Sequence, residues 1–324
     1  MQKRQGYREK ILLFVLIVGL SLIACGRQVT SDIQLSKISD LTPVPLQEGE
    51  RLRVLATTSI VGDIVGNVGG NLVELSILVP VGADPHSFSP TPQDVAAVSE
   101  AHVIFINGAG LEQFLGPLLQ SVRGSAPVIS LSEGVPLRRF SPVRKGGEEE
   151  VDPHTWMSPA NVIIFVQNIE KALVALDPAH ANEYHQNAQT YRARLEELDA
   201  WVQEQIAQIP PENRKIVTDH EAFGYYADRY GLQQIGAVIP GFSAAAEPSA
   251  KDLAALQEAI RRYGAKAIFV GVSVNPTLAR RIAEDTGIRV VRLYTGSLGP
   301  EGSGAETYID FIRYNTKAIV EALR

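Results

Sequence analysis

The stretch "AHANEYHQNAQTYRARLEELDAWVQEQIAQIPP" (residues 179–211) has helical periodicity and contains no proline until Pro210 and Pro211 end it. It predicts one helix of about 28 residues, and at about 1.5 Å per residue such a helix reaches across a whole domain. We therefore interpret it as a rigid connector between two lobes.

Two similar series of segments flank this helix. Before it, short apolar runs predict buried strands at residues 53–59, 73–80, 102–108 and 127–132, with helical segments between them. After it, strands are predicted in the same way at residues 215–220, 233–241, 265–272 and 289–295. This alternation predicts an α/β fold of two lobes, each with a mainly parallel sheet flanked by helices.

The composition limits the possible functions. With 324 residues, of which 45% are hydrophobic, the chain is long enough for two domains that each have a core. The net charge is -6, and acidic and basic residues are mixed along the chain. No basic stripe is present that could follow a phosphate backbone, so nucleic acid is not expected as a partner.

The N-terminus predicts export. Residues 1–24 have a basic start and an apolar run from Ile11 to Ile23, which is shorter than the roughly 20 residues that span a bilayer, so we interpret them as a cleaved signal peptide. Cys25, the only cysteine, follows Leu22-Ile23-Ala24 and resembles the lipidated cysteine of a bacterial lipobox; the alternative is a chance cysteine. Residues 25–50 are then a lipidated N-terminus and tether, 51–178 an N-terminal lobe, 179–210 the connecting helix and 211–324 a C-terminal lobe.

Three of the six histidines lie at the ends of predicted elements. Asp84-Pro85-His86 and Asp152-Pro153-His154 repeat one tripeptide, and His220 closes a predicted strand. Open α/β sheets place ligand residues outside such strand ends, so these imidazoles could share a metal, whereas ordinary surface histidines are the alternative. His102, His180 and His185 do not share this placement.

The repeated tripeptide has a physical interpretation. Proline restricts its own φ and that of the residue before it, so each histidine is presented from a stiff turn. Asp84 and Asp152 could cap that turn or accept a hydrogen bond from an imidazole N–H.

Five stretches, in this order, resemble a known family: "VGADPHSFSPTPQDV" (81–95), "VDPHTWMSPAN" (151–161), "VTDHEAFGYYADRYGL" (217–232), "EPSAKDL" (247–253) and "LYTGSLGPEGSGAETYIDFIRYN" (293–315). Together with the lipobox they are similar to the metal-binding, substrate-binding lipoproteins of bacterial ABC transporters that import zinc or manganese, the TroA-like family. The resemblance covers about Arg51 to Arg324.

The resemblance implies a function and a site. One divalent metal is held in the cleft between two lobes by His86 and His154 of the N-terminal lobe and His220 of the C-terminal lobe. The metal is delivered to a membrane permease that has a separate ATPase, by a lipid-anchored, extracytoplasmic, monomeric binding protein that is not an enzyme.

Two departures from the family bear on the metal. Manganese-type members usually carry glutamate where His220 stands and aspartate where Gly296 stands, and imidazole suits zinc whereas carboxylates suit manganese, so Zn²⁺ is expected over Mn²⁺. Zinc-type members often carry a histidine-rich loop before the second ligand, whereas this chain has "RKGGEEEVDPH" (144–154). Water or Glu247 is the expected fourth ligand.

Other functions remain open from the sequence. Three histidines and a water also suit a zinc-dependent hydrolase, in which Glu221 would be the candidate general base. Lipoproteins of this family have also been described as surface adhesins.

Overall fold

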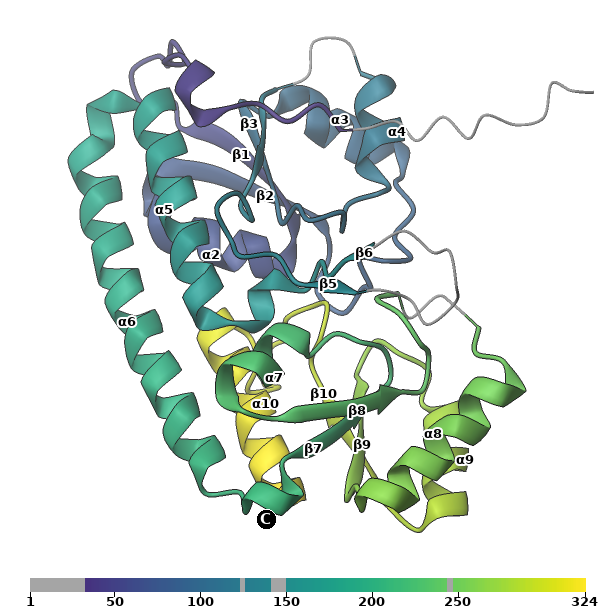
Figure 1. Ribbon diagram of the computed structural model, residues 1–324. Coiled ribbons are helices and arrows are strands. Elements are labelled where there is room, and N and C mark those ends of the chain that lie inside the picture. The colour runs from purple at the N-terminus through teal and green to yellow at the C-terminus, as the bar shows by residue number, and fades with distance from the viewer. Residues whose placement is uncertain (1–32, 123–125, 141–149, 244–246) are drawn as a thin grey trace, which may run out of the picture. The chain divides into compact units, whose positions relative to one another are not determined.

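The computed structural model describes residues 33–122, 126–140, 150–243 and 247–324 (Figure 1). The predicted signal peptide and Cys25 lie outside the described residues. The residues from Ile33 to Arg324 form one compact unit.

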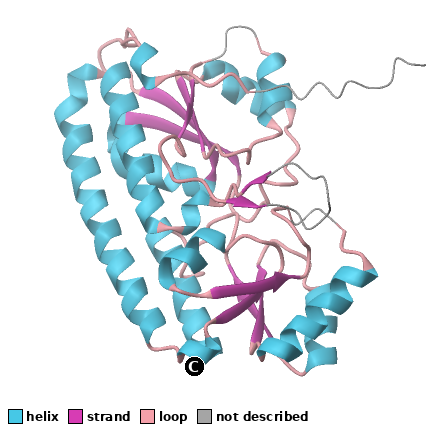
Figure 2. Ribbon diagram, viewed as in Figure 1, coloured by secondary structure: helices cyan, strands magenta, loops and turns pink. Residues whose placement is uncertain are grey.

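The first sheet contains the four strands predicted before the long helix. They are β1 (Leu52–Thr58), β2 (Val73–Val79), β3 (Val103–Ile106) and β4 (Val128–Ser130). The sheet order is β2-β1-β3-β4, and every neighbouring pair is parallel (Figure 2). β1 and β3 are central and almost wholly buried, which explains why they are apolar without alternation.

The second sheet repeats this arrangement after the long helix. It contains β7 (Lys215–Thr218), β8 (Gln233–Ala237), β9 (Ala267–Gly271) and β10 (Arg289–Leu293), in the order β10-β9-β7-β8. All of its pairs are parallel as well. The predicted α/β class with two parallel sheets is therefore confirmed.

Helices flank both sheets. Those of the N lobe, the part built on the first sheet, are α2 (Ser59–Gly69), α3 (Pro92–Glu100), α4 (Leu115–Gln120) and α5 (Pro159–Leu176). Those of the C lobe, built on the second sheet, are α7 (Gly224–Tyr230), α8 (Ala250–Tyr263), α9 (Thr277–Thr286) and α10 (Tyr308–Leu323).

Among the described residues, α5 is the one helix long and apolar enough to cross a membrane, and more than half of it is buried inside the fold. It packs against α2 and α6, as a core helix does.

The long helix is present as predicted. After a short 3-10 turn (Pro178–His180), α6 runs from Ala181 to Ala207, 27 residues. It contacts α2 and α5 of the N lobe and α10 and α7 of the C lobe, so it lies along both (Figure 1). One face of it is buried: Tyr184, Ala188, Tyr191, Leu195, Leu198, Val202 and Ile206.

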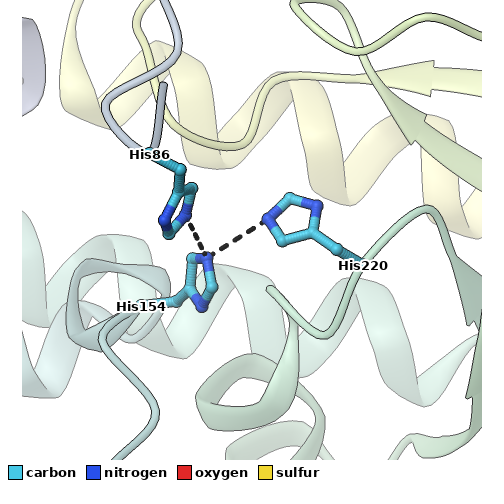
Figure 3. Close-up of side chains that lie close together, drawn as sticks. All are labelled: His86, His154 and His220. Atoms are coloured by element: carbon cyan, nitrogen blue, oxygen red, sulfur yellow. Dashed lines mark hydrogen bonds between the residues drawn. The ribbon is translucent and has the colours of Figure 1, made fainter. Parts of the chain in front are cut away.

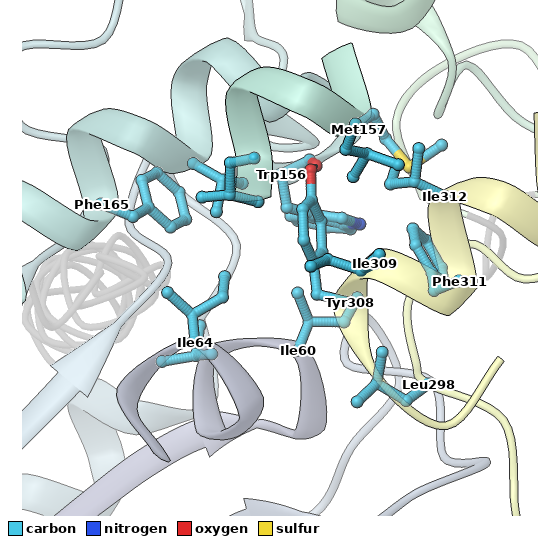
Figure 4. Close-up of a cluster of buried hydrophobic side chains, with 14 of the residues drawn as sticks. Ile60, Ile64, Trp156, Met157, Phe165, Leu298, Tyr308, Ile309, Phe311 and Ile312 are labelled. Atoms are coloured by element: carbon cyan, nitrogen blue, oxygen red, sulfur yellow. The ribbon is translucent and has the colours of Figure 1, made fainter. Parts of the chain in front are cut away.

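The largest hydrophobic core is shared by the two lobes. Ile60 and Ile64 of α2 and Phe165 of α5 belong to the same buried cluster as Tyr308 and Phe311 of α10 (Figure 4). Because this cluster joins helices of both sheets, the lobes are packed together as well as connected by the chain.

Two segments differ from the predictions. The loop expected between residues 140 and 159 contains two short antiparallel strands, β5 (Arg139–Phe140) and β6 (Glu150–Val151), and a 3-10 turn (Thr155–Met157). Part of the expected tether packs on the N lobe instead: the Ser36 N–H donates to Val128 O of the edge strand β4 (2.8 Å). Four partly buried apolar side chains of this segment pack against the core: Ile38, Leu41, Val44 and Leu46.

Candidate metal centre

Three loops bring three imidazoles together. His86 lies in the loop between β2 and α3, His154 directly precedes the Thr155–Met157 turn, and His220 follows β7. Figure 3 shows the three rings pointing toward one another. The N lobe contributes two of them and the C lobe the third, as the family resemblance implied.

The spacing of the imidazole nitrogens fits a metal ion. The Nε2 of His154 lies 3.1 Å from the Nε2 of His86 and 3.2 Å from the Nε2 of His220. The three candidate ligand atoms all lie within 4.8 Å of one another. Zn–N bonds of 2.0–2.1 Å in a tetrahedron place two nitrogens about 3.3 Å apart.

Aspartates determine which nitrogen of two of the rings carries hydrogen. Nδ1 of His154 lies 2.9 Å from Oδ1 of Asp152, and Nδ1 of His220 lies 3.0 Å from Oδ1 of Asp219. A carboxylate only accepts, so each Nδ1 is protonated and donates. The Nε2 atom of both rings therefore presents a free lone pair to the centre of the cluster.

The two copies of the tripeptide differ in what the aspartate does. Asp84 accepts from the backbone N–H of His86 (3.0 Å) and from the Ser87 hydroxyl (3.1 Å), so it caps the turn. Asp152 accepts from both the backbone N–H (3.0 Å) and the ring of His154. Both suggested roles of the aspartate therefore occur, and only the second copy combines them.

Burial favours the neutral form of His86 and His154. Burial, followed by the neighbouring His154 and His220, lowers the pKa of His86 to about 2. Burial also lowers the pKa of His154, against the opposing effect of Asp152. Burial raises the pKa of Asp219, but the interactions with His220 and with the backbone N–H groups of Gly271 and His220 outweigh this effect, and the pKa is lowered. Neutral imidazole and ionised carboxylate are the forms that suit metal binding.

The other three histidines lie elsewhere, as predicted. The ring of His102 accepts from the backbone N–H of Arg53 at 3.1 Å. His180 pairs with Asp177 and His185 with Glu170, each at 2.7 Å.

Glu247, the carboxylate expected as a possible fourth ligand, does not join the cluster. Glu247 is exposed, and no carboxylate of the described residues belongs to the group of potential ligands. Glu221 is partly buried, and burial, followed by the charge of Asp152, raises its pKa. Gly296 lies against the His86 loop: a Cβ built on it would be 2.7 Å from Cδ of Pro85.

Two residues that matter for the site were not singled out from the sequence. Asp219 directly precedes His220, so an aspartate lies close before the histidine here, as it does in the two tripeptides. This shared pattern could have indicated Asp219. Arg138 donates to Asp152 from 14 positions away, and nothing in the local sequence marks it.

The chain is similar to known metal-binding proteins along nearly its whole length. The family model described as zinc-uptake complex component A, periplasmic, matches residues 54–322. The manganese-binding lipoprotein MntA of Halalkalibacterium halodurans is 30% identical, with 95% of this chain and 96% of that protein aligned. The manganese ABC transporter substrate-binding lipoprotein PsaA of Streptococcus pneumoniae is 31% identical, with coverage of 96% and 97%.

Solved structures show the same fold. The periplasmic zinc-binding protein TroA of Treponema pallidum has 30% identity and a TM-score of 0.77, covering 85% of this chain and 99% of that one. The manganese-bound periplasmic metal-binding protein of Candidatus Liberibacter asiaticus has 28% identity and a TM-score of 0.76, covering 85% and 100%.

These relatives are named as binding proteins and transporter components, which does not support the hydrolase alternative with Glu221 as its base. The match over residues 54–322 shows that the chain belongs to the family of periplasmic zinc-uptake complex component A proteins.

Proposed function

We propose that this protein captures a divalent metal ion with His86, His154 and His220 and delivers it to an ABC importer, which consists of a membrane permease and a separate ATPase. One observation carries the proposal. The Nε2 atoms of His154 and His220 face each other at 3.2 Å, although Asp152 and Asp219 already hold the ring protons on Nδ1. With the ring protons on Nδ1, both Nε2 atoms carry lone pairs, and a cation bound between them would be ligated by both.

The surroundings support a cation. Asp152 and Asp219 are buried and place two carboxylates behind the rings, where they balance the charge of an ion without ligating it. Hydrogen bonds of this kind orient metal-ligating histidines and raise their basicity. Since the ligands come from both lobes, a bound ion links the lobes.

We further propose that zinc binds more tightly than manganese, with water as the fourth ligand. Three imidazole nitrogens suit zinc, whereas manganese prefers oxygen ligands and lies low in the divalent affinity series. The proposal for water follows from the exposed position of Glu247, outside the group of potential ligands. Several relatives are named for manganese, so the metal needs a direct test.

The test of the metal is a competition experiment. The purified protein is stripped with a chelator and titrated with zinc and with manganese against a chromophoric competitor at fixed pH. Zinc is expected to bind more tightly at equal free concentration. Tighter binding of manganese would contradict the argument from the nitrogen ligands.

The test of the ligands uses alanine variants in the same titration. His86→Ala, His154→Ala and His220→Ala are each expected to weaken zinc binding sharply, because each removes one nitrogen ligand. His180→Ala and His185→Ala are matched controls that remove surface imidazoles. If His220→Ala bound zinc as tightly as the parent, the site shared by the two lobes would be wrong.

We also propose that Cys25 carries the lipid that attaches the protein to the outer side of the membrane, since the relatives are named lipoproteins. Cys25→Ser is expected to release the protein from the membrane fraction or to leave an uncleaved precursor. Normal processing with unchanged membrane attachment would count against this assignment.

A further inference from the structure

Arg138 connects the metal centre with the opposite lobe. Its Nη1 donates to Oδ2 of Asp152 (2.8 Å), and its Nε donates to Oδ2 of Asp228 (2.6 Å) on α7. The backbone N–H of Arg138 donates to the hydroxyl of Tyr225 (3.0 Å), which donates to the carbonyl of Asp152 (3.0 Å). One arginine therefore contacts the aspartate that holds His154 and the first helix of the C lobe.

The position of the guanidinium depends on Gly224, the first residue of α7. A Cβ built on Gly224 would lie 1.7 Å from Nη1 of Arg138 and 2.6 Å from Oδ2 of Asp152. The arginine thus occupies the space that any larger residue at position 224 would fill. Its placement depends on close contact between α7 and the segment that carries the second tripeptide.

The two ends of the arginine differ in exposure. The Asp152 side chain is 0% exposed and that of Asp228 is 64% exposed. The Asp152 end of its pair is shielded from water and that pair interacts more strongly, whereas the pair with Asp228 is exposed at both ends and is weakened by solvent. The guanidinium is therefore linked more firmly to Asp152 than to Asp228 of α7.

Asp152 connects Arg138 with His154 of the cluster. Its Oδ2 accepts from Arg138, while its Oδ1 accepts from the ring of His154. With both oxygens engaged, the plane of the carboxylate is set, and with it the direction of the imidazole. A shift of Arg138 would therefore rotate the carboxylate and misdirect the Nε2 of His154.

We propose that Arg138 is a positioning residue that makes metal affinity depend on the contact between α7 and the segment 138–154. This inference rests on the proposed function, because it concerns the affinity of the same histidine cluster. It implies that displacement of α7, as by a docked permease, loosens the hold on the ion and promotes release.

The experiment is a double-mutant cycle on zinc affinity, measured by competition with a chromophoric chelator. Arg138→Met is expected to weaken zinc binding by about tenfold to a hundredfold, the usual effect of removing a residue that orients a metal ligand. Asp228→Asn is expected to weaken it about two- to fivefold in the parent, since an exposed ion pair contributes little. It should have no further effect in the Arg138→Met background.

Arg139→Met is the matched control, because Arg139 is the adjacent, exposed arginine. It is expected to leave zinc affinity unchanged. Cobalt absorption adds a readout of ligand geometry: the visible band of the Co²⁺-loaded protein should change in Arg138→Met and stay unchanged in Arg139→Met.

The outcomes separate this inference from the proposed function. If the parent binds zinc and His154→Ala does not, while Arg138→Met keeps the parent affinity, the role of Arg138 is overturned and the proposed function stands. If His154→Ala binds as tightly as the parent, the proposed function itself fails. An equal effect of Asp228→Asn with and without Arg138 would overturn the coupling.

Arg138→Lys keeps the experiment decisive if Arg138→Met does not fold. Lysine preserves the charge but lacks the planar fork that reaches two carboxylates. We expect Asp228→Asn to lose its effect in the Arg138→Lys background. A persistent effect of Asp228→Asn there would overturn the inference.

Discussion

At the scale of single residues, each histidine of the cluster follows an aspartate by one or two positions in the sequence. The three aspartates differ in their hydrogen-bond partners. Asp219 accepts from the His220 ring through one oxygen and from the Gly271 N–H (2.8 Å) through the other. Asp84 bonds only to the turn around His86. All three residues are aspartates, so their different roles follow from the groups that each carboxylate contacts.

This difference predicts unequal effects of the same substitution. Asp219→Asn is expected to weaken zinc binding by about tenfold to a hundredfold, because the amide carries no charge and cannot accept with both of its ends. Asp84→Asn should change affinity little, since asparagine also caps turns. Titration of both variants with zinc checks the prediction, and equal losses would refute it.

Gly296 gives a second prediction at this scale. Position 296 is not among the glycines with positive φ, so the backbone does not demand glycine there; the close approach of Pro85 does. Gly296→Ala is expected to displace the His86 loop and to lower zinc affinity. In Gly66→Ala, the added Cβ would be 3.6 Å from Leu75 and is expected to leave affinity unchanged. Zinc titration of the two variants decides whether this contact positions His86.

The same contact bears on conversion to a manganese site. Placing aspartate at position 296 and glutamate at position 220 would supply oxygen ligands, but the aspartate Cβ would first have to displace Pro85. Aspartate at position 296 therefore requires the loop that carries His86 to shift. Packing against Pro85, rather than the backbone φ, limits which side chains position 296 can accept.

At the scale of elements, α6 is the component that both lobes share. Its buried residues lie on the side that packs against α5 and α2 of the N lobe and against α10 of the C lobe. The exposed face of the same helix carries charged residues, as expected for a helix that packs on one side only.

Truncation of one of these buried residues should destabilise the whole unit. Leu195 is 0% exposed, and Leu195→Ala is expected to lower the free energy of unfolding by about 2–5 kcal/mol through lost burial and the remaining cavity. Glu197→Ala, two positions on and exposed, is the control and should change it by less than about 0.5 kcal/mol. Urea unfolding of the metal-free protein measures both. A two-step transition in Leu195→Ala would show that the lobes unfold separately.

At the scale of the whole molecule, hydrogen bonds join the lobes around the cluster. Asp63 of α2 accepts from the backbone N–H of Tyr308 at the start of α10 (3.0 Å), and the Gly82 N–H donates to Ser297 (2.7 Å). The Trp156 indole N–H donates to the carbonyl of Thr295 (2.9 Å). These contacts hold the two lobes together, and burial of His86 in the packed structure lowers its pKa.

Acid should therefore destabilise the metal-free protein. The pKa of His86 is about 2 when folded and about 6.5 when unfolded, so between these values the unfolded state binds more protons. The contribution of neutral His86 is complete above about pH 6.5 and decreases as the pH falls, by up to about 1.4 kcal/mol per unit.

Urea unfolding at several pH values from 7.5 to 5 tests this expectation. His86→Gln, which cannot be protonated, should make the pH dependence shallower. His185→Gln, which changes an exposed histidine, is the control. If His86→Gln had the same pH dependence as the parent, burial of His86 would not be the cause. Because the pKa of His86 is lowered, protons are also expected to compete with the metal for this histidine only well below pH 6.5.

The sequence by itself determined the strands, the long helix and the placement of His86, His154 and His220 at element ends. These depend on local periodicity and on proline turns, whose effects extend over a few residues. Only the tertiary structure decided that Asp152 and Asp219 hold the ring protons, that Arg138 lies between Asp152 and α7, and that residues 33–50 pack partly on the N lobe. Such contacts join segments far apart in the chain, and their distances depend on how the shared core packs the two sheets together, which no local pattern records.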